Sequence, residues 1–220
     1  MQHNSRPVSS NQAGIYDKLT QVVQKHLVMD YKKPIQTHNQ MAFENIVNQI
    51  DACDYRGLIL DSCCGTGQSS VHWAATYPEH LIIGIDQSYT RLNKHREQPL
   101  PDNLLLLRAN CEDIWRLCQQ HNLYFDKHFI FYPNPWPKAN HFKRRWHGHP
   151  VFPVLKSLSG ELWLRSNWVV YLQEFALAWE LLSGHRFAVN ELVGVEPVTL
   201  FERKYLASQH GLFELIIKNK

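Results

Sequence analysis

The chain has 220 residues, of which 44% are hydrophobic and 20% are charged. This length suits one domain with a hydrophobic core of its own, and the composition excludes an intrinsically disordered protein. The formal net charge of +3 is too small to favour any class of partner by itself.

The cysteines and the most apolar segments indicate the compartment. Five cysteines are present, two of them adjacent, but no CxxC pair occurs, which argues against a zinc ribbon and a disulfide framework. The N-terminal sequence MQHNSRPVSSNQ lacks the apolar core of a signal peptide. Residues 162–182 are the most apolar long segment, but Arg165 and Glu174 interrupt them, so we expect no membrane span. A cytoplasmic protein with reduced thiols is therefore expected.

The N-terminal part of the chain predicts helices. Apolar residues recur at helical spacing over residues 13–28 and 41–50, and a Lys-Lys-Pro break separates the two segments. We therefore expect an N-terminal helical extension over residues 1–50 and a second domain over residues 51–220.

From residue 57 onward, short apolar runs alternate with helical segments. The runs typical of buried strands cover residues 57–60, 81–85, 103–107, 128–132 and 161–164. Helices are expected at residues 68–76, 88–95, 111–121 and 168–182. This alternation predicts an α/β fold with a mostly parallel sheet and helices on both faces. Residues 213–219 predict a last strand, antiparallel at the edge of the sheet. Ligands of such sheets bind at the carboxyl ends of the strands.

The first predicted strand ends in LDSCCGTGQSS. Gly65 and Gly67 allow a tight turn and a close approach of a ligand to the backbone. The GxGxxG fingerprint of dinucleotide-binding proteins fails, because Cys63 and Ser70 stand where glycines are needed. Asp61 would repel a pyrophosphate, whereas it suits a ligand with an ammonium group.

The ends of two further predicted strands complete the predicted ligand-binding site. Asp86 ends the second strand, where a carboxylate can accept from both hydroxyls of a ribose. Asn110 and the backbone of Cys111 follow the third strand and are placed to line an adenine. A ligand that has both an ammonium group for one acid and a ribose for the other, and that lies against a glycine-rich turn, is S-adenosylmethionine. The predicted cofactor-binding residues are Asp61, Cys63, Gly65, Gly67, Asp86, Asn110 and Cys111.

The fourth strand is followed by YPNPWPKANHFKRRWHGHP, residues 132–150. Prolines make this turn rigid, so that Asn134 can reach a base edge and Trp136 can stack on a base. No Asp or Glu occurs from Lys127 to Gly160, and the cations Lys138, Arg144 and Arg145 suit phosphates. A polyanionic partner is therefore expected, although a solvated basic surface with tryptophans in the core stays open.

Two other kinds of site are disfavoured. The histidines His141, His147 and His149 have no thiolate or carboxylate nearby in the sequence and stand among cations, which argues against a metal site. No GxSxG motif occurs, so a Ser/His/Asp hydrolase is poorly supported.

Three motifs from residue 57 to the end resemble the bacterial tRNA (guanine-N7)-methyltransferase family. YPNPWPKANHFKRRW is similar to the family's Pro-Asp-Pro-Trp turn, LRSNWVVYLQEF to its Thr-Asp segment, and PVTLFERK to its Thr-Lys-Phe-Glu box. The resemblance implies a Rossmann-like class I methyltransferase fold and transfer of a methyl group from S-adenosylmethionine to N7 of a guanine in the variable loop of tRNA. We also expect a monomer or homodimer.

The same resemblance implies the substrate residues. Asn134 takes the position of the family's supposed catalytic Asp. The residues that would face the guanosine are Lys138, Asn167, Thr199, Phe201 and Glu202.

This sequence departs from the family where Asn134, Asn167 and Asn110 replace carboxylates and Leu200 replaces a lysine. Guanine N7 carries a free lone pair, so methyl transfer needs orientation rather than a general base. An Asn accepts without the charge of an Asp, which predicts weaker or altered base recognition. Two alternatives stay open: a catalytically weakened protein that binds S-adenosylmethionine and RNA, and a methyltransferase for another base or a small molecule.

Overall fold

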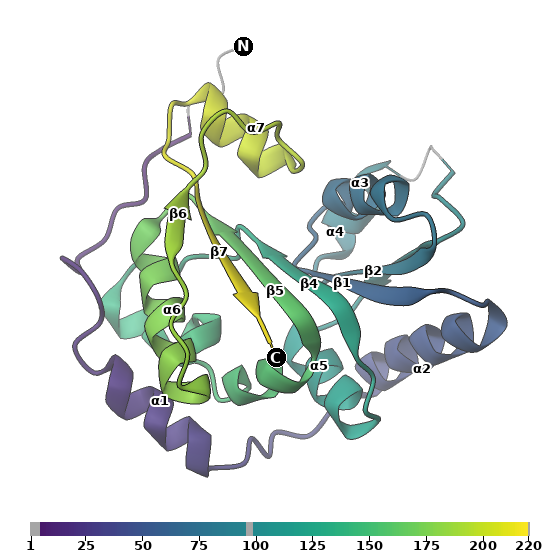
Figure 1. Cartoon of the computed structure of the whole chain (residues 1–220), viewed down its shortest axis with the longest axis horizontal. Helices are drawn as coiled ribbons and strands as arrows, with labels where there is room; N and C mark the ends of the chain where they lie inside the picture. The colour runs from purple at the N-terminus through teal and green to yellow at the C-terminus, as the bar shows by residue number, and fades with distance from the viewer. Residues whose placement is uncertain (1–4, 96–98, 220) are drawn as a thin grey trace. The chain divides into compact units, whose positions relative to one another are not determined.

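The structure is a computed structural model that describes residues 5–95 and 99–219. Its strands form one sheet in the order β3-β2-β1-β4-β5-β7-β6 (Figure 1). The strands are β1 (Gly57–Ser62), β2 (His80–Asp86), β3 (Leu104–Arg108), β4 (Phe125–Phe131), β5 (Ser159–Ser166), β6 (Val189–Glu191) and β7 (Phe213–Lys218). The expected α/β fold with a mostly parallel sheet is confirmed.

The α-helices are α1 (Leu19–Val28), α2 (Thr37–Ala52), α3 (Gln68–Thr76), α4 (Tyr89–Leu92), α5 (Cys111–Gln120), α6 (Val169–Ser183) and α7 (Leu200–Ala207). Short 3₁₀ helices are η1 (Asn93–His95), η2 (Ala139–Arg144), η3 (Trp146–Gly148) and η4 (Phe152–Ser157). In the described part of the chain, no helix has both the length and the apolar character needed to cross a membrane.

The chain divides into two compact units. The first unit contains the described residues of Met1–Lys32, Tyr132–Lys156 and Trp163–Ile217. The second unit contains those of Lys33–Phe131, Ser157–Leu162 and Lys218–Lys220. The domain boundary predicted at residue 50 does not coincide with the division into these two units, and it stays a prediction.

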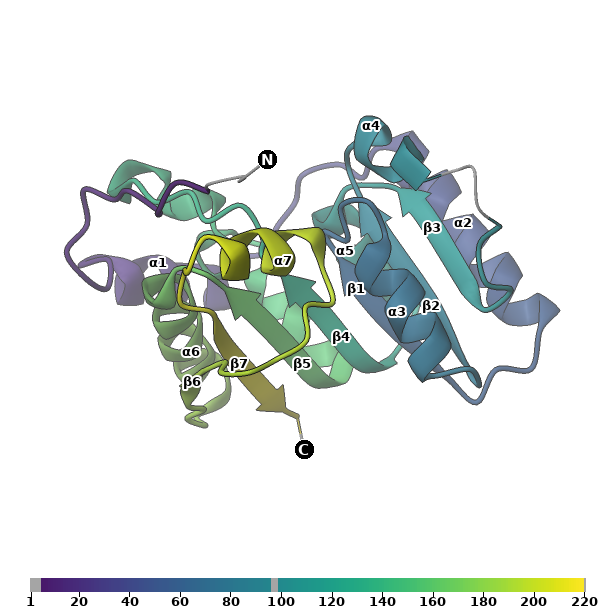
Figure 2. The ribbon, with the colours of Figure 1, turned by 90° about the horizontal axis from the view of Figure 1, so that it is seen from above.

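The second unit holds four parallel strands in the order β3-β2-β1-β4. Helix α3 covers one face of these strands, and α2 and α5 lie together on the other (Figure 2). Because both faces are covered, the strands are continuous apolar runs, with Ile59, Leu60 and Ile82 fully buried. Because β1, β2 and β3 are parallel neighbours, their carboxyl ends lie side by side along one edge of the sheet.

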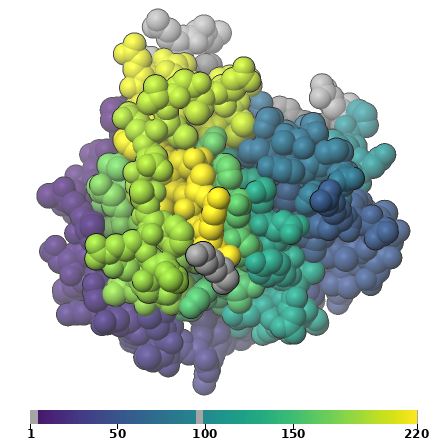
Figure 3. Space-filling model, in the orientation of Figure 1, coloured from purple at the N-terminus to yellow at the C-terminus, as the bar shows by residue number. Residues whose placement is uncertain are grey.

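The first unit is built around α6, which packs against α1. Phe175 and Trp179 of α6 are fully buried and form part of the core of this unit. Strand β7 pairs antiparallel with β6, so β7 is not at the edge of the sheet as expected; β6 lies outside it. Strand β6 has three residues, half-buried or exposed, and so gives no apolar run to recognise. Helix α7, also not predicted, lies at the surface (Figure 3).

Candidate functional site

The glycine-rich turn after β1 has a left-handed backbone at Cys63 (φ 61°), Gly65 (φ 63°) and Gly67 (φ 79°). The φ of Gly67 favours glycine there, and a Cβ would lie 2.7 Å from Leu106 Cδ1, so the Leu106 side chain of β3 would have to shift. A Cβ on Gly65 would meet nothing within 4 Å. The turn therefore leaves open space at Gly65 and is tightly packed at Gly67.

Asp86, at the end of β2, holds this turn in place. Its Oδ2 accepts a hydrogen bond from the Gly65 amide over 3.0 Å, and its Oδ1 accepts from the Ser88 amide over 2.7 Å. Arg91 Nη2 lies 3.1 Å from the same Oδ1, and the Asp86 side chain is only 2% exposed. The carboxylate is thus fixed in orientation by three donors at the edge where β1 and β2 end.

Asp61 lies at the same edge and has an unused oxygen. The hydroxyls of Ser69 and Ser70 both donate to its Oδ2 over 2.7 Å. No donor among residues 5–95 and 99–219 reaches its buried Oδ1. Burial raises the pKa of Asp61 to about 6, although the two hydroxyl hydrogen bonds oppose the shift. A buried acceptor without a partner is costly, and a cationic donor would satisfy it.

The third strand end brings Asn110 and Cys111 to this edge. The Asn110 amide donates to Asn39 Oδ1 over 3.0 Å, and Asn39 Nδ2 donates to Asp113 over 2.6 Å, so α2 fixes the start of α5. Cys111 Sγ lies 3.9 Å from Cys63 Sγ. The hydrogen bond with Cys63 and burial raise the pKa of the Cys111 thiol, which therefore stays protonated. All seven predicted cofactor residues thus lie at the carboxyl ends of β1, β2 and β3 or on the segments that directly follow them.

In the first unit, the segment after β4 forms a rigid turn around Asn134. The Trp136 amide donates to Asn134 Oδ1 over 3.3 Å, and Trp136 itself has a left-handed backbone with φ 45°. The Arg144 guanidinium lies over the Trp136 ring, 4.6 Å from its centroid. Asn134, Lys138 and Arg144 are exposed, as a base and phosphate contact requires.

Arg145 differs from the expectation that it holds a phosphate. Its side chain is 0% exposed and forms an ion pair with Glu174 of α6, also 0% exposed. The guanidinium also donates to the Trp136 carbonyl. The two neighbouring arginines separate because η2 ends at Arg144, which leaves one side chain outside and directs the next into the core.

The Thr-Leu-Phe-Glu box forms the start of α7. Thr199 Oγ1 accepts from the Glu202 amide over 3.0 Å, while the Glu202 carboxylate accepts from the Thr199 amide over 3.2 Å. This reciprocal cap occupies Thr199 Oγ1 and Glu202 Oε2, and both side chains are buried. Leu200 and Phe201, 41% and 42% exposed, are the members of the box that lie at the surface.

Asn167, at the end of β5, is half-buried. Its Nδ2 lies 3.3 Å from His210 Nδ1, so the amide is held by the segment after α7.

Two residues of this region were missed in the sequence. Arg165 of β5 donates to Glu202 Oε1 over 2.9 Å, and the Tyr132 hydroxyl donates to the same oxygen over 3.2 Å. These bonds join the residue after β4, the strand β5 and the cap of α7. The sequence has no signal for Arg165 or Tyr132 themselves. It does have one for the helix that they contact, because Thr199 followed three residues later by Glu202 is a capping box and indicates a helix start.

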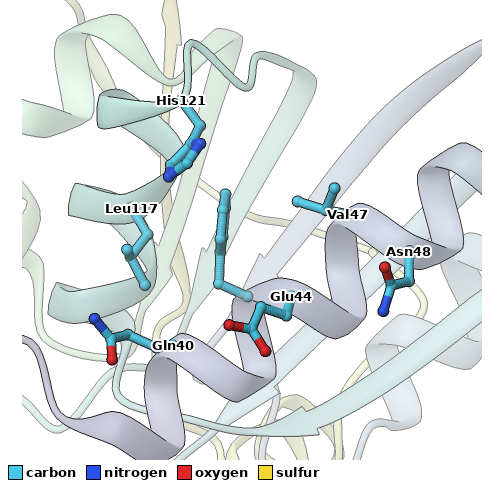
Figure 4. A pocket seen from close by; sticks show the side chains of 7 residues that line it. Gln40, Glu44, Val47, Asn48, Leu117 and His121 are labelled. Carbon is cyan, nitrogen blue, oxygen red and sulfur yellow. The ribbon is translucent and has the colours of Figure 1, made fainter.

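A separate pocket of about 420 Å³ lies between α2 and α5 (Figure 4). Its lining residues are Gln40, Phe43, Glu44, Val47, Asn48, Leu117 and His121. None of the predicted site residues lines it, and no group of three or more potential metal ligands occurs among residues 5–95 and 99–219.

Two proteins with similar sequences carry the same name. A tRNA (guanine-N(7)-)-methyltransferase of Pseudomonas savastanoi pv. phaseolicola is 27% identical over 163 residues, covering 69% of this chain and 66% of that protein. A protein of the same name from Klebsiella pneumoniae subsp. pneumoniae is 28% identical over 166 residues, covering 70% and 69%. The chain thus spans about two thirds of the length of these relatives.

Among solved structures, a 16S rRNA (adenine(1408)-N(1))-methyltransferase from Catenulisporales acidiphilia superimposes with a TM-score of 0.57. It is 13% identical and covers 80% of this chain and 91% of that chain, which shows a shared fold alone. The Rossmann-like methyltransferase fold expected from the sequence is confirmed. Residues 56–215 match the family described as putative methyltransferase. The chain therefore belongs to this methyltransferase family.

Proposed function

We propose that the chain transfers a methyl group from S-adenosylmethionine to N7 of a guanine in tRNA. The observation that carries this proposal is the likeness, over 163 and 166 residues, to relatives named tRNA (guanine-N(7)-)-methyltransferase. Residues 51–220 form the methyltransferase domain in this proposal, and tRNA as the substrate implies the cytoplasm.

The second unit would hold the methyl donor. The Asp86 carboxylate is buried and oriented by the Gly65 amide and Arg91, and the remaining lone pairs of its oxygens would accept from ribose hydroxyls. The unpartnered Oδ1 of Asp61 suits the ammonium group of the donor. The open space at Gly65 admits a ligand next to the backbone. When bound, S-adenosylmethionine supplies an electrophilic methyl group on its sulfonium sulfur.

The first unit would hold the guanine and the phosphates. Guanine N7 needs no proton removed before attack, so the residues of this unit have to orient the base rather than act as a general base. Asn134 reaches the base edge from a rigid turn, and the exposed ring of Phe201 offers a stacking surface. Lys138 and Arg144 are exposed cations for the RNA backbone.

One observation favours a second candidate, a protein that binds both ligands but transfers slowly. The Oδ1 of Asn134 is hydrogen-bonded inside its own turn, so the side chain presents its amide nitrogen rather than a charged acceptor. A donor of this kind fits guanine O6, but it does not bind the N1–H and N2 groups that a carboxylate would bind.

A transfer assay separates the two candidates. The protein is incubated with S-adenosylmethionine labelled in its methyl group and with bulk tRNA that lacks 7-methylguanosine, and the tRNA is digested to nucleosides. Label in 7-methylguanosine is the expected result. Binding of both ligands without transfer would support the second candidate, and label in another nucleoside would overturn the assignment of guanine N7.

A further inference from the structure

We propose that the N-terminal segment of the chain and a buried ion pair act as positioning residues for the proposed base-binding turn. The turn, residues 133–139, is called the base loop below. The residues that hold it, called the clamp, are Ser10, Asn11, Gln12, Arg145 and Glu174. This inference rests on the proposed function and assigns a role to a segment that lies outside residues 56–215, the part that matches the family.

The base loop needs support from outside itself. Trp136 has φ 45° and Tyr132, just before the loop, has φ 50°. Such left-handed backbone is unfavourable for residues with a Cβ, and it persists where the surroundings hold it in place. Pro133, Pro135 and Pro137 have no amide to donate, so the loop has few bonds of its own beyond the one from Trp136 to Asn134.

The buried side chain of Arg145 binds two carbonyls of the loop. Its Nε and Nη2 donate to the Trp136 carbonyl over 3.2 and 3.1 Å, and Nη2 also lies 3.4 Å from the Lys138 carbonyl. Its Nη1 donates to Glu174 Oε2. A buried guanidinium is tolerated only when it is paired and hydrogen-bonded, so these bonds fix its place and that of the loop.

The N-terminal segment provides the other residues that bind the loop. The Ser10 hydroxyl donates to the Pro137 carbonyl over 2.6 Å, and Asn11 Oδ1 accepts from the Ala139 amide over 3.0 Å. Gln12 Oε1 accepts from Arg145 Nη2 over 3.1 Å. The carbonyls from Trp136 to Lys138 and the amide of Ala139 are thus all bound by clamp residues.

Glu174 joins the two halves of the clamp. Its Oε1 accepts from Gln12 Nε2 over 2.6 Å and from the Tyr16 amide over 2.8 Å, while its Oε2 is bound by Arg145 and lies 2.9 Å from His147 Nε2. Burial raises the pKa of Glu174, but the bonds and charges of His147 and Arg145 outweigh it and leave the pKa below its usual value. The carboxylate therefore stays charged, and the segment from Gln12 to Tyr16 is attached to the same anion as Arg145.

The clamp can be loosened at its surface without disturbing the ion pair. The double variant Ser10→Ala/Asn11→Ala removes the bonds to Pro137 and Ala139, and its parent residues are half-buried and exposed. Ser9→Ala, next to it and exposed, is the matched control. Ser10→Thr/Asn11→Asp, which keeps a hydroxyl and an acceptor oxygen, is the conservative variant that should restore the wild-type values.

Three measurements are made on the full chain: amide hydrogen exchange at Ala139, affinity for S-adenosylmethionine, and kcat and KM for tRNA. The double variant should exchange the Ala139 amide about tenfold faster and lower kcat/KM for tRNA by a similar factor. Its affinity for S-adenosylmethionine and its Tm should match those of the Ser9→Ala control. Unchanged exchange at Ala139 would overturn the clamp, and faster exchange with unchanged kcat/KM would overturn its role in catalysis.

A second variant tests the buried residues of the clamp. Arg145→Lys keeps a positive charge for Glu174 but loses the planar fork that reaches the Trp136 carbonyl at the same time. It should lower kcat while the protein still binds S-adenosylmethionine with wild-type affinity; unchanged kcat would contradict the role of Arg145. If the wild-type protein itself transfers no methyl group, the proposed function fails, whereas the exchange at Ala139 still decides whether the clamp holds the loop.

Discussion

The amide of Trp136 donates a hydrogen bond to Asn134 Oδ1 over 3.3 Å, and this bond closes the turn that follows β4. The resemblance of this segment to the Pro-Asp-Pro-Trp turn of the tRNA (guanine-N7)-methyltransferases implies an aspartate at this position in that family. One oxygen of a carboxylate would make the same bond and leave a second, charged oxygen free. Asn134 has only one oxygen and no charge, so a base would have to share this acceptor with the Trp136 amide.

Replacing Asn134 by aspartate should therefore retain or raise methyl transfer. The second carboxylate oxygen would accept from guanine N1–H and N2, and charge-assisted bonds are about twice as strong as neutral ones. We expect kcat/KM for tRNA to lie between the wild-type value and about tenfold above it. Steady-state kinetics with one tRNA transcript measure the change. Complete loss of transfer in Asn134→Asp would show that the amide nitrogen has a role of its own.

Asp86→Ala should weaken the binding of the methyl donor. The substitution removes the acceptor for the ribose hydroxyls and leaves the Gly65 and Ser88 amides without their partner. Losing hydrogen bonds to a charged group predicts a Kd that is roughly 10- to 100-fold higher. Isothermal titration calorimetry measures it, with the exposed Asp54→Ala as a control that should bind as the wild type does. Equal affinity in Asp86→Ala would exclude Asp86 from the donor site.

Donor binding should also weaken as the pH falls through about 6. The pKa of Asp61 is raised to about 6, mainly by burial, so the carboxyl is neutral below that pH and ionised above it. A neutral carboxyl attracts the ammonium of S-adenosylmethionine poorly, and the association constant should fall by up to about tenfold per pH unit. Calorimetric titrations between pH 5 and 7 measure how the association constant changes with pH. The Asp61→Asn variant should bind S-adenosylmethionine weakly at every pH in this range. A flat profile in the wild type would argue against Asp61 as the partner of the ammonium.

The same shift affects stability with the opposite sign. The folded protein holds the Asp61 proton up to about pH 6, whereas the unfolded chain releases it near 3.8. The contribution of this group to the free energy of unfolding is therefore largest at low pH and is lost as the pH rises from 3.8 to about 6.

Lys138→Ala should weaken RNA binding without changing the affinity for the methyl donor. Lys138 is exposed beside the base loop, where its charge can neutralise a phosphate. Removing one such contact should lower the slope of log K against log salt by about 1 and weaken binding similarly for all tRNA sequences. Binding titrations at several salt concentrations measure this, with the exposed Lys218→Ala in β7 as the control. An unchanged slope in Lys138→Ala would remove Lys138 from the RNA surface.

The central strands were predictable because their burial on both faces leaves a recognisable pattern in the sequence. Strands covered on both faces are continuous apolar runs, and Asp61 and Asp86 could be found because they occur where two such runs end. Strand β6 and helix α7 were missed because they are short and largely exposed, so neither has an apolar face that repeats.

The partners of the site residues could not be predicted, since they come from distant parts of the chain. Asn39 binds the Asn110 amide from 71 residues away, and Glu174 binds Arg145 from 29 residues away. Arg144 and Arg145 are chemically identical neighbours, and only the path of η2 decides that one is exposed and the other buried. Which cation of a basic run faces a ligand is thus a property of the fold.

Methyl transfer to guanine N7 is tested most directly with two transcripts of the same tRNA, one with ordinary guanine and one with 7-deazaguanine, which has a carbon in place of N7. Both transcripts carry the same phosphates and the same N1–H and N2 groups, so they should bind the protein with similar affinity. The protein should transfer labelled methyl groups to the ordinary transcript and none to the 7-deazaguanine transcript. Equal transfer to both would contradict guanine N7 as the acceptor.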